Sequence, residues 1–180
     1  MRVRDFILLA TEESRIIFRY YVDKSELTRQ DGVYRWDASW MIAAFEKSEV
    51  ERQWKLKKRL FVMEKDADSA LTYLGESIRY VLSNRLDHFR EPSYGRPASD
   101  WVIRYKKDHY TNRRTGEQVN DPLNNHIELQ VYDNTTNMGY KFFLSKKAAR
   151  SFAAFVDDCF YESLVQFGDR ADVPGFLPFA

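Results

Sequence analysis

Apolar and polar positions along the chain follow two different periods. Residues 3–10, 16–22, 34–45 and 52–63 are rich in apolar, β-branched and aromatic side chains, and the sequence predicts a strand in each. The polar residues 11–14 separate the first two segments, so we expect them to form a hairpin. An amphipathic helix over residues 5–20 is the alternative, but the run of Ile, Phe, Tyr and Val favours a strand.

From residue 66 the apolar positions recur at steps of three and four, as they do on one face of a helix. The predicted stripe contains Ala67, Ala70, Leu71, Leu74, Ile78, Val81 and Leu82. Residues 87–99 carry two prolines and one glycine without periodicity, which indicates a linker. Beyond it we expect strands at 101–107, 126–133 and 139–144, a polar loop or hairpin at 108–125, and a helix capped by Ser145.

The two halves of the chain repeat the same order of elements. The two helices align without a gap, which places Phe61 on Phe143, Lys65 on Lys147 and Ala67 on Ala149. We therefore predict an α+β fold of tandem strand-rich repeats, each of about four antiparallel strands and then one helix. Residues 1–180 form one domain in this prediction, with repeats at 1–86 and 100–167, a linker at 87–99 and a tail at 168–180. A sheet covered by a helix on one face leaves its other face to solvent or to a partner.

The charges of the chain are nearly balanced overall but unevenly distributed. The sequence has 28 Lys and Arg against 27 Asp and Glu. Residues 52–60 nevertheless contain five cations and no acid, and residues 101–114 contain five cations opposed only by Asp108. Two basic segments therefore stand on a neutral chain, and their positions say more about a polyanionic partner than the net charge does.

Cations and aromatic rings alternate in the predicted strands, as binding of single-stranded nucleic acid requires. Strand alternation predicts that Lys55, Lys57 and Arg59 share one face. The other candidate nucleic-acid-binding residues are Arg19, Tyr21, Trp54, Arg104, Lys106, Tyr110, Arg113 and Arg114. The alternative is that charged outer faces only keep the sheet soluble and that Trp54 packs beneath its helix. Trp36, Trp40 and Trp101 are expected in the core more often than on a binding surface.

The sequence gives little support for catalysis. The three histidines have no metal-ligand spacing, and Cys159 lies on the apolar stripe of the second helix, where a buried inert thiol is expected. No glycine-rich phosphate loop is present. We therefore expect no enzyme activity, no cofactor and no metal. No apolar run approaches the roughly 18 residues that span a bilayer, so we expect an intracellular protein without a membrane partner.

Residues 59–82 (RLFVMEKDADSALTYLGESIRYVL) and 140–164 (YKFFLSKKAARSFAAFVDDCFYESL) resemble the last strand and helix of a PUR repeat. In layout, the chain is similar to the Whirly and PUR-alpha-type proteins and to the Whirly-like RNA-binding proteins of nucleus-forming jumbo phages. The chain lacks the Lys-Gly-Lys-Ala-Ala-Leu segment of plant Whirly proteins, so no binding residue is carried over from them. The resemblance implies single-stranded nucleic-acid binding, with RNA slightly favoured over DNA, in the cytoplasm or host-cell interior.

The apolar tail contains Phe176, Leu177 and Phe179 and is expected to dock on its own domain or on another subunit. Edge strands and such a tail together predict a homo-oligomer, most simply a dimer or tetramer. The leading hypothesis is thus a non-catalytic protein that binds single-stranded RNA or DNA with little sequence preference. The alternative is a structural or protein-interaction module that does not bind nucleic acid.

Overall fold

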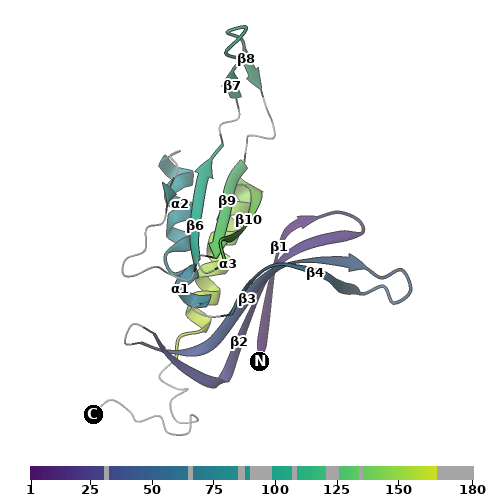
Figure 1. Cartoon of the computed structure of the whole chain (residues 1–180), viewed down its shortest axis with the longest axis vertical. Coiled ribbons are helices and arrows are strands. Elements are labelled where there is room, and N and C mark those ends of the chain that lie inside the picture. The colour runs from purple at the N-terminus through teal and green to yellow at the C-terminus, as the bar shows by residue number, and fades with distance from the viewer. Residues whose placement is uncertain are drawn as a thin grey trace.

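The structure is a computed structural model, and it describes residues 1–30, 33–64, 67–84, 88–89, 99–106, 109–120, 126–133 and 136–165. The tail from residue 168, most of the linker, and the side chains of Tyr110 and the three histidines lie outside the described part. Figure 1 shows an α+β molecule in which the strands of two sheets run in different directions. The predicted fold class is confirmed.

The first half forms a sheet of four antiparallel strands in the order β1-β2-β3-β4. The strands are β1 (Arg2–Ala10), β2 (Ser14–Gln30), β3 (Val33–Lys47) and β4 (Trp54–Met63). Thr11 closes the first turn, because its Oγ1 accepts a 3.0 Å hydrogen bond from the Ser14 amide and its own amide donates to the Ser14 carbonyl at 2.8 Å. The predicted hairpin is therefore confirmed, and the alternative helix is wrong.

The first predicted helix is broken into two, α1 (Ala67–Leu71) and α2 (Leu74–Asn84). Tyr73 has a φ of 60°, a left-handed conformation that no continuous α-helix contains. The break lets the two pieces pack on different neighbours. Trp40 of β3 donates from Nε1 to the Ala67 carbonyl at 3.0 Å, whereas Arg79 of α2 pairs with Asp157 of the last helix at 2.8 Å.

The second half forms another four-stranded antiparallel sheet, in the order β10-β9-β6-β5, and a small hairpin of β7 and β8. Its strands are β5 (His88–Phe89), β6 (Ser99–Tyr105), β7 (His109–Thr111), β8 (Gln118–Asn120), β9 (His126–Asp133) and β10 (Met138–Ser145). Helix α3 (Lys146–Glu162) follows, and the Ser145 side chain accepts from the Ala148 amide at 3.1 Å, as predicted for its cap. The polar segment 108–125 is thus a hairpin in its described part, with Gly116 at a φ of 71°.

The inner faces of both sheets and all three helices contribute to one shared core. Trp40 of the first sheet stacks on Trp101 of the second, with ring centroids 5.9 Å apart, and both rings are fully buried. Phe152 of α3 packs against Trp101 and, at 5.4 Å, against Phe18 of β2. Trp36 is also buried, so the tryptophans expected in the core lie there. The two predicted repeats therefore depend on each other for burial of their aromatic residues.

A buried polar network ties the end of α3 to the first sheet. Arg35 donates to the Ser163 hydroxyl at 2.9 Å and lies over the Phe160 ring, while the Trp36 amide donates to the Ser163 carbonyl at 2.8 Å. Nearby, the Tyr20 hydroxyl donates to Asp68 at 3.0 Å. Burial raises the pKa of Asp68, which opposes the lowering effect of these partners. The last described residues, 163–165, therefore lie next to β3.

Candidate nucleic-acid interface

Strand β4 does not present its cations as simple alternation predicts. Its pairing with β3 shifts register twice, and Lys57 and Leu60 are extra residues with no opposite partner. Lys55 consequently pairs with Glu46, while Arg59 pairs with Ala43 on the other face of the sheet. The prediction that Lys55, Lys57 and Arg59 share one face is therefore wrong, because each bulge reverses the inward and outward positions that follow it.

Lys55 and Lys57 also have acidic partners close to the β3–β4 turn. Lys55 pairs with Glu51 at 2.9 Å, and Lys57 pairs with Glu46. Both cations are thus compensated locally. Of the three cationic candidates on β4, Arg59 alone lies on the face that Arg19 and Tyr21 also share, because Tyr21 and Arg19 lie opposite Ser39 and Met41 of β3.

We call this outer surface the first-sheet face: the face of β1–β4 that carries Ile17, Met41, Ala43 and Phe45 and turns away from the shared core. These four side chains form a second, smaller apolar cluster, against which Tyr21 and Trp54 pack. Trp54 therefore does not lie beneath a helix, in contrast to the alternative considered above. Four exposed apolar side chains flank the cluster: Val3, Ile7, Leu56 and Val62.

Arginine side chains lie across the rings of the first-sheet face. The guanidinium of Arg15 is 4.0 Å from the centre of the Trp54 ring, and that of Arg19 is 4.6 Å from the Phe45 ring. Asp5 accepts two hydrogen bonds from Arg19, at 2.7 and 2.8 Å, and this contact raises the pKa of Arg19. Sequence reasoning missed Arg15. The available signal was its position two residues before Ile17, which places the two side chains on the same face of β2.

The outer surface of the second sheet gathers three cations around one carboxylate. We call it the second-sheet face: the face of β6, β9 and β10 that carries Arg104, Glu128, Lys141 and Phe143. Glu128 is only 5% exposed, and it contacts Lys106 at 3.0 Å, Lys141 at 3.3 Å and Arg104 at 3.5 Å. The candidates Arg104 and Lys106 are therefore brought together, and Lys141 joins them. Among the described side chains of this face, three cations and one carboxylate leave an excess of positive charge.

Phe143 lies directly opposite Glu128 in the ladder and points away from the core. Its neighbours Phe142 and Leu144 are buried, whereas Phe143 is 53% exposed. On the same face, the ring of Tyr132 lies over Gly139, so close that a Cβ there would be 3.1 Å from the ring. Sequence reasoning missed Phe143 and Tyr132. The cation two residues before Phe143 was the signal, since positions i and i+2 of a strand share a face.

The pKa of Glu128 reports the balance of charges on this face. Burial alone raises the pKa, but hydrogen bonds and positive charge from Lys106 and Lys141 outweigh it and hold the pKa below its usual value of 4.5. The unfolded chain therefore binds the proton more readily than the folded chain. The stabilisation from ionised Glu128 is complete above the usual value and is lost as the pH falls through the lower, folded value.

We accordingly expect Glu128→Gln to lower the free energy of unfolding at neutral pH. The free energy of unfolding of this variant should also fall less than that of the wild type when the pH is lowered. Urea unfolding followed by far-ultraviolet circular dichroism between pH 3 and pH 7 measures this. The difference between the wild type and the variant should shrink as the pH falls below about 4.5. A difference that stays constant across this range would contradict the assignment. Glu117→Gln, on the exposed hairpin, is the matched control for the loss of a surface carboxylate.

The β7–β8 hairpin carries the remaining candidates. Arg113 and Arg114 are exposed at its tip, where the Arg114 amide donates to the Asn112 side chain at 2.9 Å and the Gly116 amide donates to the Asn112 carbonyl at 2.8 Å. Figure 1 places this hairpin beyond the ends of β6 and β9. Tyr110 lies in β7, and its side chain is outside the described part. These three candidates are thus separate from both sheet faces.

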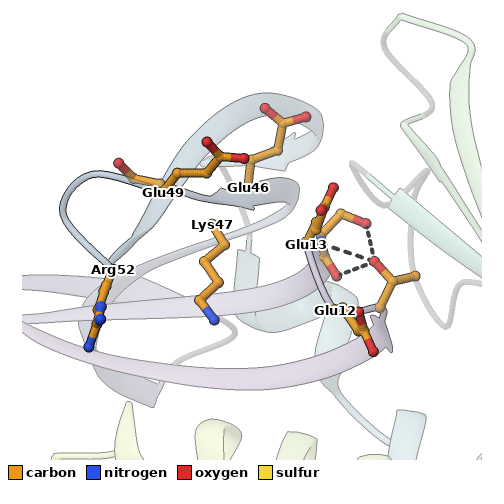
Figure 2. A pocket seen from close by; sticks show the side chains of 9 residues that line it. Glu12, Glu13, Glu46, Lys47, Glu49 and Arg52 are labelled. Carbon is orange, nitrogen blue, oxygen red and sulfur yellow. Dashed lines mark hydrogen bonds between the residues drawn. The ribbon is translucent and has the colours of Figure 1, made fainter.

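An open hollow of about 850 Å³ lies between the β1–β2 and β3–β4 turns. Figure 2 shows its charged lining residues: Glu12, Glu13, Glu46, Lys47, Glu49 and Arg52. Four carboxylates against two cations make this hollow unsuited to a phosphate backbone. This hollow is therefore not where the cations and rings gather.

The described residues offer little for catalysis. None of their His, Cys, Asp and Glu side chains form a group of three that could hold a metal ion. Cys159 is buried in α3, and burial raises the pKa of its thiol, which keeps it protonated and unreactive at neutral pH. Within the described part, none of the helices has the length and apolar character needed to cross a membrane.

Comparison with known proteins finds similarity among solved structures. No family model and no curated protein matches the chain. The crystal structure of WHY1 from Arabidopsis thaliana matches with 11% identity, 96% coverage of both chains and a TM-score of 0.35. The plant transcriptional regulator PBF-2 matches with 12% identity, 99% coverage of this chain, 98% of that chain and a TM-score of 0.33. Both are Whirly proteins, the family that the sequence resembles; with TM-scores below 0.5 they assign no role to any residue here.

Proposed function

We propose that this chain is a non-catalytic protein that binds single-stranded nucleic acid, with little sequence preference, through the second-sheet face. The observation that carries the proposal is the outward Phe143 beside Arg104, Lys106 and Lys141. An exposed ring contributes nothing to the core, whereas an unpaired base can stack on it while the cations contact the flanking phosphates.

The chemistry of this face favours single strands over duplexes. A ring can stack only on a base whose own face is free, and in a duplex that face is covered by the next base pair. Sequence preference is expected to be weak, because every base has a π-face and phosphate contacts carry no sequence information. Gln130, between Val102 and Lys141 in the ladder, has the one amide side chain among the described residues of this face and is the group that could add a hydrogen bond to a base.

Replacing Phe143 with alanine tests the proposal directly. Fluorescence anisotropy with a labelled single strand should show affinity reduced by roughly 5- to 150-fold, the range that corresponds to about 1 to 3 kcal/mol for loss of one stacked base. Since the ring is half exposed, the variant should remain folded. Tyr161→Ala is the matched control, because Tyr161 is an exposed ring on α3 and outside both sheet faces. Equal affinity of wild type and Phe143→Ala would refute the second-sheet face as the site.

Charge variants require Glu128 to be changed together with its partners, because removing only the cations leaves a nearly buried carboxylate unpaired. Glu128→Gln alone should bind more tightly, since three cations then face the phosphates. Lys106→Gln and Lys141→Gln in the Glu128→Gln background should weaken binding to all sequences and reduce the salt slope by roughly 0.7 per lost contact. No change in slope would show that these two lysines do not contact phosphate.

Three further properties belong to the proposal and are measured with the same reagents. A slight preference for RNA over DNA is tested with strands of identical sequence, and a homo-oligomer is tested by light scattering. Preference for single strands is tested with the matching duplex. If no nucleic acid binds at low salt, the proposal fails and the protein-interaction module is the function to pursue.

A further inference from the structure

We infer that the first-sheet face is a second, separate site for single-stranded nucleic acid, so that one chain holds two strand segments at once and bridges them. The inference rests on the proposed function, because the same ligand class is assigned to both faces. It extends that function from binding to bridging.

The two faces share one chemical plan although their residues differ. The second-sheet face has three cations around Glu128, and the first-sheet face has Arg15, Arg19 and Arg59, with Asp5 bound to Arg19. Asp23 and Asp37 lie opposite each other farther along β2 and β3, beyond Tyr21 and Ser39, so Arg15 and Arg59 make the end of this face next to β4 positively charged. Both surfaces therefore suit a polyanion.

Arg15 and Arg19 lie over aromatic rings, which hold the two guanidinium groups in place for contact with a base. A guanidinium lying over an aromatic ring presents its own planar upper side, and nucleic-acid bases stack on such planes. Trp54 and Phe45 fix these two groups from below, at 4.0 and 4.6 Å. Leu56 is exposed and lies opposite Phe45 in the ladder. It therefore adds apolar surface for a base beside the two arginines, and its partner Phe45 carries no negative charge.

Charge also distinguishes this ligand from an apolar protein partner. An apolar surface laid over the first-sheet face would bury Arg15 and Arg59 away from water, and the described residues show no ion pair with either to offset that cost. A nucleic-acid strand brings phosphates for the cations and bases for the apolar positions between them. The mixture of stacked arginines and exposed aliphatic residues therefore favours single-stranded nucleic acid.

The two faces are separated by the core of the protein. Trp40 and Trp101 extend from the inner faces of the two sheets and stack on each other, so each outer face turns away from the region where the sheets meet. Figure 1 shows the two sheets as separate layers whose strands run in different directions. A short oligonucleotide on one face cannot occupy the other. We therefore expect each chain to bind two short oligonucleotides at the same time, one on each face.

Native mass spectrometry with a six-nucleotide single strand measures this ratio. We expect two oligonucleotides per chain for the wild type, whatever its oligomeric state. Arg15→Gln with Arg59→Gln should leave one, and Phe143→Ala in the Glu128→Gln, Lys141→Gln background should also leave one. Arg15 and Arg59 are chosen because the Asp5–Arg19 pair then stays intact. Lys147→Gln with Arg150→Gln, two exposed cations of α3, is the matched control and should retain two.

Bridging is then measured by capture of a labelled strand on an immobilised strand that is not complementary to it. The wild type should retain the label, and each single-face variant should retain at least tenfold less. One oligonucleotide per chain in the wild type, or loss of both with the second-sheet variant alone, would overturn the second site and leave the proposed function standing. Absence of any bound oligonucleotide would instead refute the proposed function. A first-sheet variant that still binds two would show that this face has another occupant.

Discussion

Replacing Trp40 with alanine should destabilise the protein by about 3 to 5 kcal/mol, the range for removing a large aromatic residue from a packed core. Trp40 is fully buried and stacks on Phe18, Phe61 and Trp101, with centroid distances of 4.9, 5.5 and 5.9 Å. It also donates a hydrogen bond to the Ala67 carbonyl, which would lose its partner. Urea unfolding followed by far-ultraviolet circular dichroism measures the change.

Trp40→Phe separates the contributions of this residue. It keeps an aromatic ring between the sheets but loses the hydrogen bond and part of the volume. Its free energy of unfolding should therefore lie between that of the wild type and that of Trp40→Ala. Trp54→Ala is the control for loss of a tryptophan outside the shared core. A cost for Trp40→Ala no larger than that of Trp54→Ala would contradict the role of Trp40 as the contact between the sheets.

Replacing Gly75 with alanine should cost about 3 kcal/mol, at the upper end of the range for overpacking. Gly75 begins the close approach of α2 to α3: a Cβ there would be 2.8 Å from the Ala153 carbonyl oxygen and would also collide with the Asp157 carboxylate. The backbone oxygen cannot move away independently, and Asp157 is held by Arg79. The two helices would have to separate, although alanine itself favours a helix.

Gly116→Ala is the informative comparison for Gly75→Ala. Gly116 has open space around it but a φ of 71°, so alanine there should cost only about 1 to 2 kcal/mol through backbone strain. Thermal unfolding of both variants shows whether crowding at position 75 destabilises the protein more than backbone strain at position 116. If Gly75→Ala proved neutral or stabilising, the helices would be able to adjust, and the close contact would not determine their packing.

The elements were predictable from sequence because local residue preferences and long-range packing agree. The predicted strand at 126–133 has the bounds of β9, and Ser145 caps α3 as expected. The break after α1 was not predictable from the apolar stripe, since Leu71, Leu74 and Ile78 fit one continuous helix equally well. The break arises because α1 packs on β3 and α2 packs on α3, a choice made by partners far away in the sequence.

The candidate site was predictable in kind but not in position. Alternation assigns faces correctly only until the first bulge, and the bulges at Lys57 and Leu60 depend on pairing with β3. On β10, Phe142 and Phe143 are adjacent, so alternation shows that one ring points outward without showing which. Pairing with β9 and packing of α3 decide it. Cations near each other in sequence, such as Lys55 and Lys57, were therefore weaker guides than cations on different strands.

The irregular pairing of β4 has a consequence for behaviour at high concentration. An edge strand with free amides and carbonyls can template pairing with another molecule, and uninterrupted pairing of this kind leads to fibres. Strand β4 is such an edge, but two bulges interrupt its regular spacing, and Lys58 and Arg59 add positive charge that repels a second copy of the strand. Molecules crowded side by side on one polymer should consequently not pair with one another along β4, because its backbone offers no long regular stretch to a neighbouring strand.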